Sequence, residues 1–217
     1  VDELIYYMFS DRHRQKPEEG RIYERVYIGG DYGQQNATTY QAFALDTYRR
    51  KFPGLDEFYH SGRETGRQKS PSEYAQDLIE LTEEIHEKYR SIVFYVYLDP
   101  SAQGLQEEIR RAVRSAGLDY SVYLRDAENE VALGISRVQK ALTFDVLSVA
   151  PAQKNLIEEM GLYQYDKKSI EKGKEIPVKE SDHIKKVVLC DEEGEVCFWL
   201  LPFLKPSYVR GIFPEKE

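Results

Sequence analysis

The chain has 217 residues, of which 41% are hydrophobic and 31% are charged, and its formal net charge is −8. This length suffices for one sizeable α/β domain, and the composition is that of a globular protein rather than a disordered or fibrous one. The negative net charge argues against a protein that coats nucleic acid by bulk attraction. It is compatible with an enzyme that has a local basic track and an acidic metal site.

The first 25 residues are charged throughout and lack an apolar core like that of a signal peptide. No apolar run approaches the roughly 20 residues that a membrane helix needs. The two cysteines, Cys190 and Cys197, are too few for a disulfide scaffold. We therefore expect no membrane partner and a reducing, intracellular compartment.

The N-terminal third predicts an arm followed by an antiparallel meander. Residues 1–20 are polar and end in KPEEG, which indicates a linker or arm that leads into a domain. Residues 23–30 (YERVYIGG) are rich in β-formers and predict a strand. Second and third strands are expected over residues 38–47 and near residues 57–61.

A helix is predicted to begin after Ser70. This residue is a typical N-cap, Pro71 occupies the first helical position, and Glu73 lies three residues after the cap. Apolar residues then recur at helical spacing. The sequence therefore predicts that the meander leads directly into a helix.

Strands and helices alternate in the remainder of the chain. Residues 92–98 (IVFYVYL) form a continuous apolar run, as expected for a fully buried central strand. The later segments are a helix over 105–116, a strand over 119–124, a helix over 130–143, a short strand over 146–149 and a helix over 153–160. This order predicts an α/β fold, a mixed five-stranded sheet with helices on both faces. It resembles the RNase H-like fold of the integrase and resolvase type.

The first candidate site residue is Asp31, which closes the strand over residues 23–30 and is flanked by glycines. Glycine allows a backbone and a large anionic ligand to approach closely. A carboxylate at the end of a strand in a rigid sheet is well placed to bind a metal ion. The alternative for Asp31 alone, an ordinary turn residue after a strand, has equal weight.

The second candidate is Asp99, which ends the buried strand over residues 92–98. We expect this strand to lie beside the first one, which would bring Asp31 and Asp99 together. Two close carboxylates do not readily both stay charged without a cation between them. A pair of divalent ions about 4 Å apart would resolve this and would suit phosphodiester cleavage.

The third candidate is the adjacent pair Asp182 and His183, an oxygen ligand beside an imidazole that can bind a metal or move a proton. Such a pair is more often structural. The other histidines, His13, His60 and His86, are expected in a linker, a strand and a polar helix face, where no function is predicted.

An ordered set of motifs resembles a known family. It comprises residues 27–33 with Asn36 and Thr38, residues 99–102, residues 127–131 with 134–135 and 138–139, Asn155 with Glu158 and residues 163–166, and residues 173–183. In this order they resemble the C-terminal nuclease domain of the large terminase subunit of tailed bacteriophages, in the branch that includes prophage terminases. The resemblance covers about residues 20–183.

The resemblance implies a two-metal endonuclease that cuts concatemeric double-stranded DNA during head packaging. Carried over by position, Asp31 and Asp99 would bind Mg²⁺ or Mn²⁺, and Asp182 and His183 would lie at the same cluster. An ATPase motor domain precedes the nuclease in the family, and this chain has no GxxxxGK[ST] loop. The expected partners are therefore DNA, that motor domain, the portal and the small terminase subunit, in the cytoplasm of the bacterial host.

Three further residues are candidate contacts to DNA. Lys179 is a candidate phosphate contact just before the last motif, and Gln34 and Asn36 follow Asp31 in the first motif. All three have polar side chains that could reach a nucleic-acid backbone.

One departure from the family pattern concerns Lys186. The family has an Asp three residues beyond the His of its last motif, whereas this chain has Lys186 there. If Lys186 occupies that ligand position, one metal is weakened or lost, and Asp182 or Asp191 could substitute. Residues 187–201 then predict a β-hairpin with an acidic turn, either a packed part of the domain or the end of a frameshifted or degenerate copy.

These observations divide the chain into an arm (1–20), a nuclease domain (21–186) and a C-terminal hairpin or tail (187–217). Two alternatives to a nuclease stay open. The first is a binding module of the same fold that has lost full activity and holds DNA or the portal, as Lys186 would suggest. The second is an actin-like ATPase, because Asp31 with Thr38 resembles a phosphate loop, although a second glycine-rich loop is missing.

Overall fold

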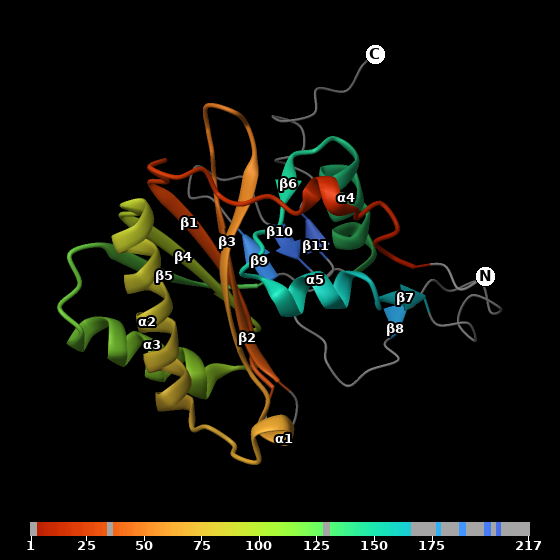
Figure 1. Ribbon diagram of the computed structural model, residues 1–217. Helices are drawn as coiled ribbons and strands as arrows, with labels where there is room; N and C mark the ends of the chain where they lie inside the picture. The colour runs from red at the N-terminus through yellow and green to blue at the C-terminus, as the bar shows by residue number, and fades with distance from the viewer. Residues whose placement is uncertain are drawn as a thin grey trace.

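The computed structural model describes residues 4–33, 37–127 and 131–165, together with four short strands further along the chain. A six-stranded mixed sheet forms its centre, with helices on both sides (Figure 1). The strands are β1 (Arg25–Asp31), β2 (Thr38–Ala44), β3 (Phe52–His60), β4 (Val93–Leu98), β5 (Ser121–Asp126) and β6 (Leu147–Ser148). Their order across the sheet is β5-β4-β1-β2-β3-β6.

The directions of the strands follow from their connections. Strands β1, β2 and β3 are antiparallel neighbours, as expected for a meander, whereas β4 is parallel to β1 and β5 is parallel to β4. The parallel pairs are linked through helices, which return the chain to the same end of the sheet. The mixed α/β fold is as predicted. The sheet has one strand more than the five expected, because the two-residue β6 pairs with β3.

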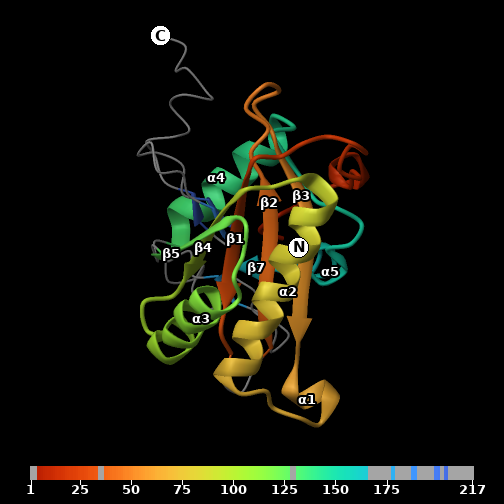
Figure 2. The same ribbon diagram turned by 90° about the vertical axis from the view of Figure 1, so that its left-hand side faces the viewer.

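Helices cover both faces of the sheet (Figures 1 and 2). Helices α2 and α3 lie against one face, and α4 and α5 against the other. The helices are α1 (Gly62–Thr65), α2 (Pro71–Tyr89), α3 (Gln103–Ser115), α4 (Val131–Thr143) and α5 (Lys154–Met160). A single 3₁₀ turn, Asp11–His13, precedes the sheet. Within the described residues no helix has both the length and the apolar character needed to cross a bilayer.

Alternate residues of β1 contribute to two separate hydrophobic cores. Val26 and Ile28 belong to the core beneath α2 and α3, whereas Tyr27 belongs to the core beneath α4 and α5. Strand β4 alternates in the same way: Phe94 and Val96 face α2 and α3, and its tyrosines face the other side. A strand buried on both faces reads as a continuous apolar run, which is why β4 could be recognised from the sequence.

The predicted start of α2 is confirmed. The Ser70 Oγ accepts a hydrogen bond from the Glu73 backbone N–H at 3.3 Å, and the Ser70 backbone N–H donates to Glu73 Oε2 at 2.8 Å. This reciprocal pair satisfies two backbone donors at the helix N-terminus, which have no partner within the helix.

We expect Ser70→Ala to lower the free energy of unfolding by about 1 kcal/mol, because the capping oxygen is lost. Urea unfolding followed by circular dichroism measures this change. Ser72→Ala, which alters an exposed serine in the first turn of the same helix, is the control and should change stability much less. Equal losses in the two variants would contradict the capping role of Ser70.

Part of the predicted arm packs onto the domain. Ile5 and Tyr6 are buried in the core beneath α4, and the Ile5 backbone N–H donates to the Tyr163 carbonyl at 2.8 Å. Directly after the arm, the Arg21 guanidinium forms hydrogen bonds of 2.7 and 2.8 Å to the buried Asp46 carboxylate. The domain boundaries given above stay predictions, but residues 4–20 do not behave as a free linker.

Because of the Asp46 carboxylate, we expect the stability of the folded domain to depend on pH. Burial raises its pKa, but hydrogen bonds from the Arg49 backbone N–H and from Arg21 outweigh burial and hold the pKa below its ordinary value. An Asp with a lowered folded-state pKa stabilises the protein above its unfolded pKa of about 3.9, and this contribution is lost as the pH falls through the folded pKa. The stability advantage of the parent over Asp46→Asn should therefore be complete above about pH 5 and shrink as the pH falls from about 5 to about 2. Urea titrations across that range measure it, and a constant difference would contradict the prediction.

The C-terminal strands form small sheets of their own. Strands β9 (Val187–Leu189) and β10 (Phe198–Leu200) pair antiparallel, which confirms the strand pairing of the predicted hairpin. A further strand, β11 (Phe203–Leu204), extends this sheet, and β7 (Gln164–Tyr165) pairs with β8 (Pro177–Val178). Strand β9 lies beside β1, and β10 and β11 lie beside α4 (Figure 1). The predicted acidic turn between β9 and β10 lies outside the described residues.

Candidate functional site

Asp31 and Asp99 lie at the ends of two neighbouring strands at the centre of the sheet. Strands β1 and β4 are parallel, and their last paired residues are Gly30 and Leu98. The next residue of each strand is the aspartate, so Asp31 and Asp99 occupy equivalent positions at one edge of the sheet. The expected proximity of the two strand ends is thus observed, whereas the role of the two carboxylates as metal ligands stays a prediction.

Both aspartates face the side of the sheet covered by α4 and α5. A Cβ on Gly30 would point into the core under α2 and α3, 2.5 Å from Leu98 Cδ2, so the following residue, Asp31, points the other way. Asp99 follows Leu98 in the same manner, and Tyr97 before it belongs to the opposite core. Both aspartates are partly exposed, as a site that binds a ligand requires.

The turn after β4 orients the Asp99 carboxylate. Asp99 Oδ1 accepts hydrogen bonds from the Ser101 backbone N–H at 2.8 Å and from Ser101 Oγ at 2.6 Å. The Ala102 N–H donates to the Asp99 carbonyl at 2.9 Å, which closes the turn. One carboxylate oxygen is therefore fixed by the sequence Asp-Pro-Ser-Ala, a local arrangement typical of Asx turns.

A third acidic strand end, Asp126, lies on the other side of the sheet. Asp126 ends β5 and pairs in register with Leu98 of β4. Its Oδ1 accepts a hydrogen bond of 3.1 Å from Gln106 Nε2 of α3, which packs on the opposite face from α4. Asp126 thus resembles the two candidate ligands in sequence context but belongs to a different face.

A buried polar network lies on the same face as Asp31 and had no predicted role. At its centre is Gln41 of β2, which is fully buried; its Nε2 donates to Glu57 Oε2 at 2.6 Å and to Thr39 Oγ1 at 3.2 Å. Gln153, just before α5, donates from its Nε2 to Gln41 Oε1 at 3.1 Å. The run of β-forming residues in β2 predicts a strand but gives no sign of this network.

Glu57 belongs to this network and is not a metal ligand in this arrangement. Its Oε1 accepts from the backbone N–H and the side-chain amide of Asn155, both at 2.7 Å, and its Oε2 accepts from the Leu156 N–H at 3.1 Å as well as from Gln41. Four donors occupy the lone pairs that a carboxylate offers. Glu57 therefore caps the N-terminus of α5 and joins it to the sheet.

The loop between β3 and α2 lies close to the turn that follows Asp31. Gln68 Nε2 of this loop lies 3.5 Å from the Gly33 carbonyl, and the Tyr32 ring packs edge-on against Tyr74 of α2. The loop carries Arg63, Arg67 and Lys69, but Arg67 pairs with Glu73 and Lys69 pairs with Asp77. The basic side chains of this loop are thus partly neutralised within the fold.

The remaining candidate residues, Gln34, Asn36, Lys179, Asp182 and His183, lie outside the described residues, as does Lys186. Within the part of the chain that the structure describes, no group of three or more His, Cys, Asp or Glu side chains could hold a metal ion. The pair at the strand ends would therefore need ligands from elsewhere.

The three other histidines have structural partners. His60 Nδ1 lies 2.9 Å from the Tyr74 hydroxyl, and burial together with the nearby Lys69 lowers the pKa of His60. His86 Nδ1 lies 2.7 Å from the Ser91 carbonyl. His13 was expected in a linker, but it is buried, with Nε2 at 2.8 Å from the Leu142 carbonyl.

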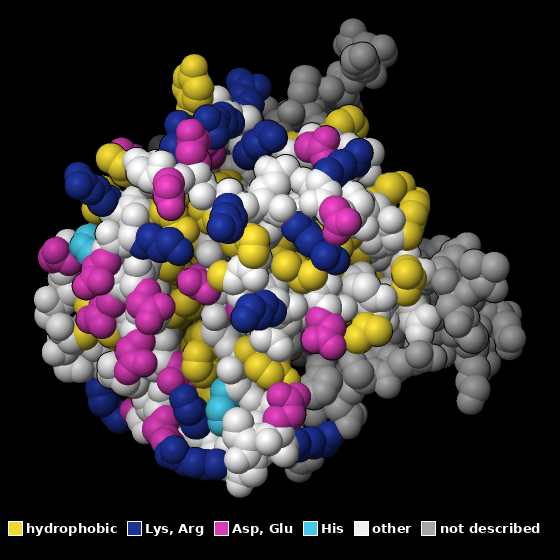
Figure 3. Space-filling model, in the orientation of Figure 1, with side chains coloured by type: hydrophobic (Ala, Val, Ile, Leu, Met, Phe, Trp, Pro, Cys, Tyr) yellow, Lys and Arg dark blue, Asp and Glu magenta, His cyan; other side chains and the backbone are white. Residues whose placement is uncertain are grey.

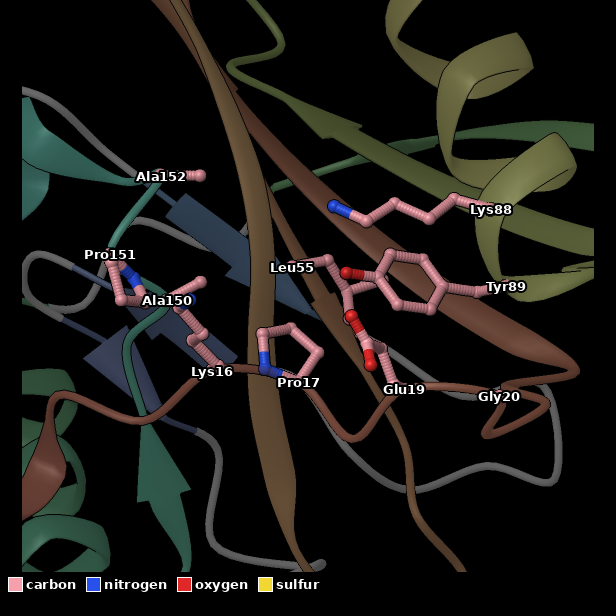
Figure 4. A pocket seen from close by; sticks show the side chains of 10 residues that line it. All are labelled: Lys16, Pro17, Glu19, Gly20, Leu55, Lys88, Tyr89, Ala150, Pro151 and Ala152. Carbon is pink, nitrogen blue, oxygen red and sulfur yellow. The ribbon is translucent and has the colours of Figure 1, made fainter.

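The clearest cavities lie away from the two aspartates. One pocket of about 290 Å³ lies between the arm, the C-terminal end of α2 and the turn before α5, and it is lined by Lys16, Glu19, Lys88 and Tyr89 among others (Figure 4). It is near the start of β1, because the Tyr23 N–H donates to the Tyr89 carbonyl. Asp31 lies at the other end of that strand. This pocket is therefore at the opposite end of the sheet from the candidate site.

The charges on the surface are mixed. On the face seen in Figure 3, acidic and basic side chains are interspersed, with no continuous basic area. This face therefore offers no large basic area, in keeping with the net charge of −8.

Comparison with known proteins identifies the fold and shows a similarity to large terminases. Neither the protein-family models nor the curated proteins include a match to this chain. Among solved structures, the large terminase of a thermophilic bacteriophage is 31% identical, with a TM-score of 0.70 over 84% of this chain and 43% of that one. The structure of this chain is similar to those of large-terminase nuclease domains. It spans less than half of the thermophilic phage protein.

Two structures of isolated terminase nuclease domains have the same fold as this chain. The P22 large terminase nuclease domain matches with a TM-score of 0.57 at 14% identity, over 76% of this chain and 80% of that domain. The human cytomegalovirus terminase nuclease domain, soaked with Mn, matches with a TM-score of 0.51 at 12% identity, over 70% of this chain and 77% of that one. The predicted RNase H-like fold is confirmed by these matches.

Proposed function

We propose that this chain is the metal-dependent endonuclease domain of a phage or prophage terminase, which cuts concatemeric double-stranded DNA during packaging. The observation that carries the proposal is the alignment of Asp31 with Asp99 at the ends of β1 and β4, on one face and partly exposed. Homology to the large terminase of the thermophilic phage supports the same function.

The donor set fits Mg²⁺ or Mn²⁺. Carboxylate oxygens are the ligands that these hard cations prefer, and Asp99 is already oriented by Ser101. The cytomegalovirus domain of the same fold was soaked with Mn. Two bound ions would supply an activated water and would stabilise the leaving oxygen of the scissile phosphodiester.

This chain's own residues would have distinct tasks. Asp31 and Asp99 would hold the ions in place against the rigid centre of the sheet, and Asp182 and His183 would complete the cluster. Lys179, Gln34 and Asn36 would contact the DNA backbone and orient it, since phosphate contacts fix the register of a nucleic acid without reading its sequence.

The proposed partners follow from the relatives. The large terminase of the thermophilic phage has been solved in complex with ATP-gamma-S and is more than twice as long as the region that matches. We propose that an ATPase motor domain belongs to the same terminase as this nuclease, and that the portal and the small terminase subunit are its other partners. The site of action would be the cytoplasm of the bacterial host.

Incubation of the purified chain with supercoiled plasmid and Mn²⁺ tests the proposed function. We expect conversion to nicked and linear DNA, suppressed by excess EDTA, together with Mn²⁺ binding in isothermal titration calorimetry. If the folded protein neither binds Mn²⁺ nor cuts the plasmid, the nuclease assignment is wrong.

A second candidate function is a binding module of the same fold, which holds DNA or docks the portal without efficient cleavage. Lys186 motivates it, because a lysine stands where the family has an acid. DNA binding by the folded protein without Mn²⁺-dependent cleavage would favour this function. Gain of cleavage in Lys186→Asp would show that this position limits activity.

A further inference from the structure

A buried threonine, Thr39, lies directly opposite Asp31, and the proposed function gives it no role. Thr39 of β2 is the direct antiparallel partner of Asp31 in β1. Directly opposed side chains lie on the same face, with Cβ atoms about 4.5–5.5 Å apart. Thr39 is fully buried, whereas Asp31 is partly exposed, so the pair spans the boundary between the core and the sheet edge.

Hydrogen bonding determines which way the Thr39 hydroxyl can donate. Its Oγ1 accepts a hydrogen from Gln41 Nε2 at 3.2 Å. The Gln41 amide has no freedom to reverse, because its other N–H donates to Glu57 Oε2 and its Oε1 accepts from Gln153 Nε2. A buried hydroxyl that accepts from one side needs an acceptor for its own hydrogen. The register places Asp31 directly opposite on the same face, where its carboxylate can accept this hydrogen.

The outer members of this chain of hydrogen bonds are firmly held. Glu57 is fixed by the N-terminus of α5 through Asn155 and Leu156, and Gln153 Oε1 accepts from the Ala150 N–H at 2.9 Å. Gln41 and Gln153 are both fully buried. Networks in which every member is satisfied are rigid, and their loss costs more than single pairs suggest.

We propose that Thr39 is a positioning residue, held by Gln41, that orients the Asp31 carboxylate for binding a divalent cation. This rests on the proposed function of Asp31 as a metal ligand. Thr39 touches neither the metal nor the DNA in this proposal. It acts through Asp31, in the way that partners of metal ligands commonly set ligand orientation and metal affinity.

Comparison of Thr39→Val with Thr39→Ser in the full chain tests the proposal. Valine has nearly the same shape and lacks the hydroxyl, whereas serine retains it. We expect Thr39→Val to weaken Mn²⁺ affinity about 10–100-fold in isothermal titration calorimetry, with a parallel loss of plasmid cleavage. Thr39→Ser should restore most of the affinity. Thr39→Ala, which cannot crowd the site, is measured alongside in case Val does not fit.

Thr82→Val is the matched control. Thr82 of α2 is also fully buried, and its hydroxyl is hydrogen-bonded to the Ile79 carbonyl and the Tyr120 hydroxyl, but it lies under the other face of the sheet. Its loss should lower the thermal unfolding midpoint in EDTA without changing Mn²⁺ affinity.

The outcomes separate the positioning role from the proposed function. If the parent binds Mn²⁺ and cleaves while Thr39→Val and Thr39→Ala bind Mn²⁺ as the parent does, the positioning role is wrong and the nuclease assignment stands. Equal losses of Mn²⁺ affinity in Thr39→Val and Thr82→Val would show that Thr39 has only a general structural role. A folded parent that binds no Mn²⁺ would overturn both proposals.

Discussion

Replacing Asp31 with Asn is expected to reduce Mn²⁺-dependent plasmid cleavage by at least about 100-fold, beyond the 10–100-fold that loss of a ligand's outer partner commonly costs. The amide has nearly the same size but carries no charge, so the site loses one of its negative charges and attracts a divalent cation less strongly. Stability should change little, because Asp31 is partly exposed. Cleavage rate, Mn²⁺ affinity and thermal midpoint are measured on the same preparation.

Asp126→Asn is the control that the sheet provides. Asp126 also ends a strand next to β4, the edge strand β5, but it accepts a hydrogen bond from Gln106 of α3, on the other face. This variant should cleave within a few-fold of the parent. Asp99→Asn should resemble Asp31→Asn. If Asp31→Asn cuts as well as the parent, or if Asp126→Asn loses as much activity, the assignment of the two aspartates fails.

Gly30→Ala is expected to lower the free energy of unfolding by about 1–3 kcal/mol, the usual cost of forcing an extra methyl into a packed core. The added Cβ would lie 2.5 Å from Leu98 Cδ2 and 2.9 Å from Tyr40 Cδ1, and both side chains are fully buried. Tyr40 cannot move freely because its hydroxyl donates to the Tyr74 carbonyl at 3.0 Å. Urea unfolding in EDTA measures the loss.

The same substitution should also weaken Mn²⁺ binding, because β1 and β4 must separate slightly at Gly30 and Leu98, directly before the two aspartates. Gly104→Ala in α3 is the control, since a Cβ there would meet no atom within 4 Å and alanine is the better helix former. A Gly30→Ala variant as stable as the parent would show that the strands adjust without cost.

The packing around residue 30 explains why this position is a glycine. From the sequence it was expected to admit a large ligand beside Asp31. The structure instead places it against Leu98 and Tyr40, on the face away from the aspartates. Its absent side chain leaves room for the Leu98 and Tyr40 side chains on that face, whereas the parallel register of β1 and β4 brings the two strand-end aspartates side by side.

Local signals in the sequence were sufficient to predict the main helices and strands and to select the candidate metal ligands. The Ser70 cap, the apolar run of β4 and the aspartates at strand ends each depend on residues within a few positions of one another, and such short-range preferences act before any tertiary contact forms. For the same reason the β9–β10 pairing could be expected from residues 187–201.

Tertiary structure decided what depends on residues far apart in the chain. That Asp31 and Asp99 align follows from the register between β1 and β4, and a shift by one residue would have turned one aspartate to the other face. The burial of His13 follows from its packing under Leu142, more than a hundred residues away. The network of Thr39, Gln41 and Glu57 could not be predicted from the sequence either, because the hydrogen-bond partners of polar strand residues are set only when α5 packs against the sheet. The sequence by itself determined the two aspartates as candidate ligands, and only the packing of the sheet decided that they share one face, with a buried threonine opposite Asp31.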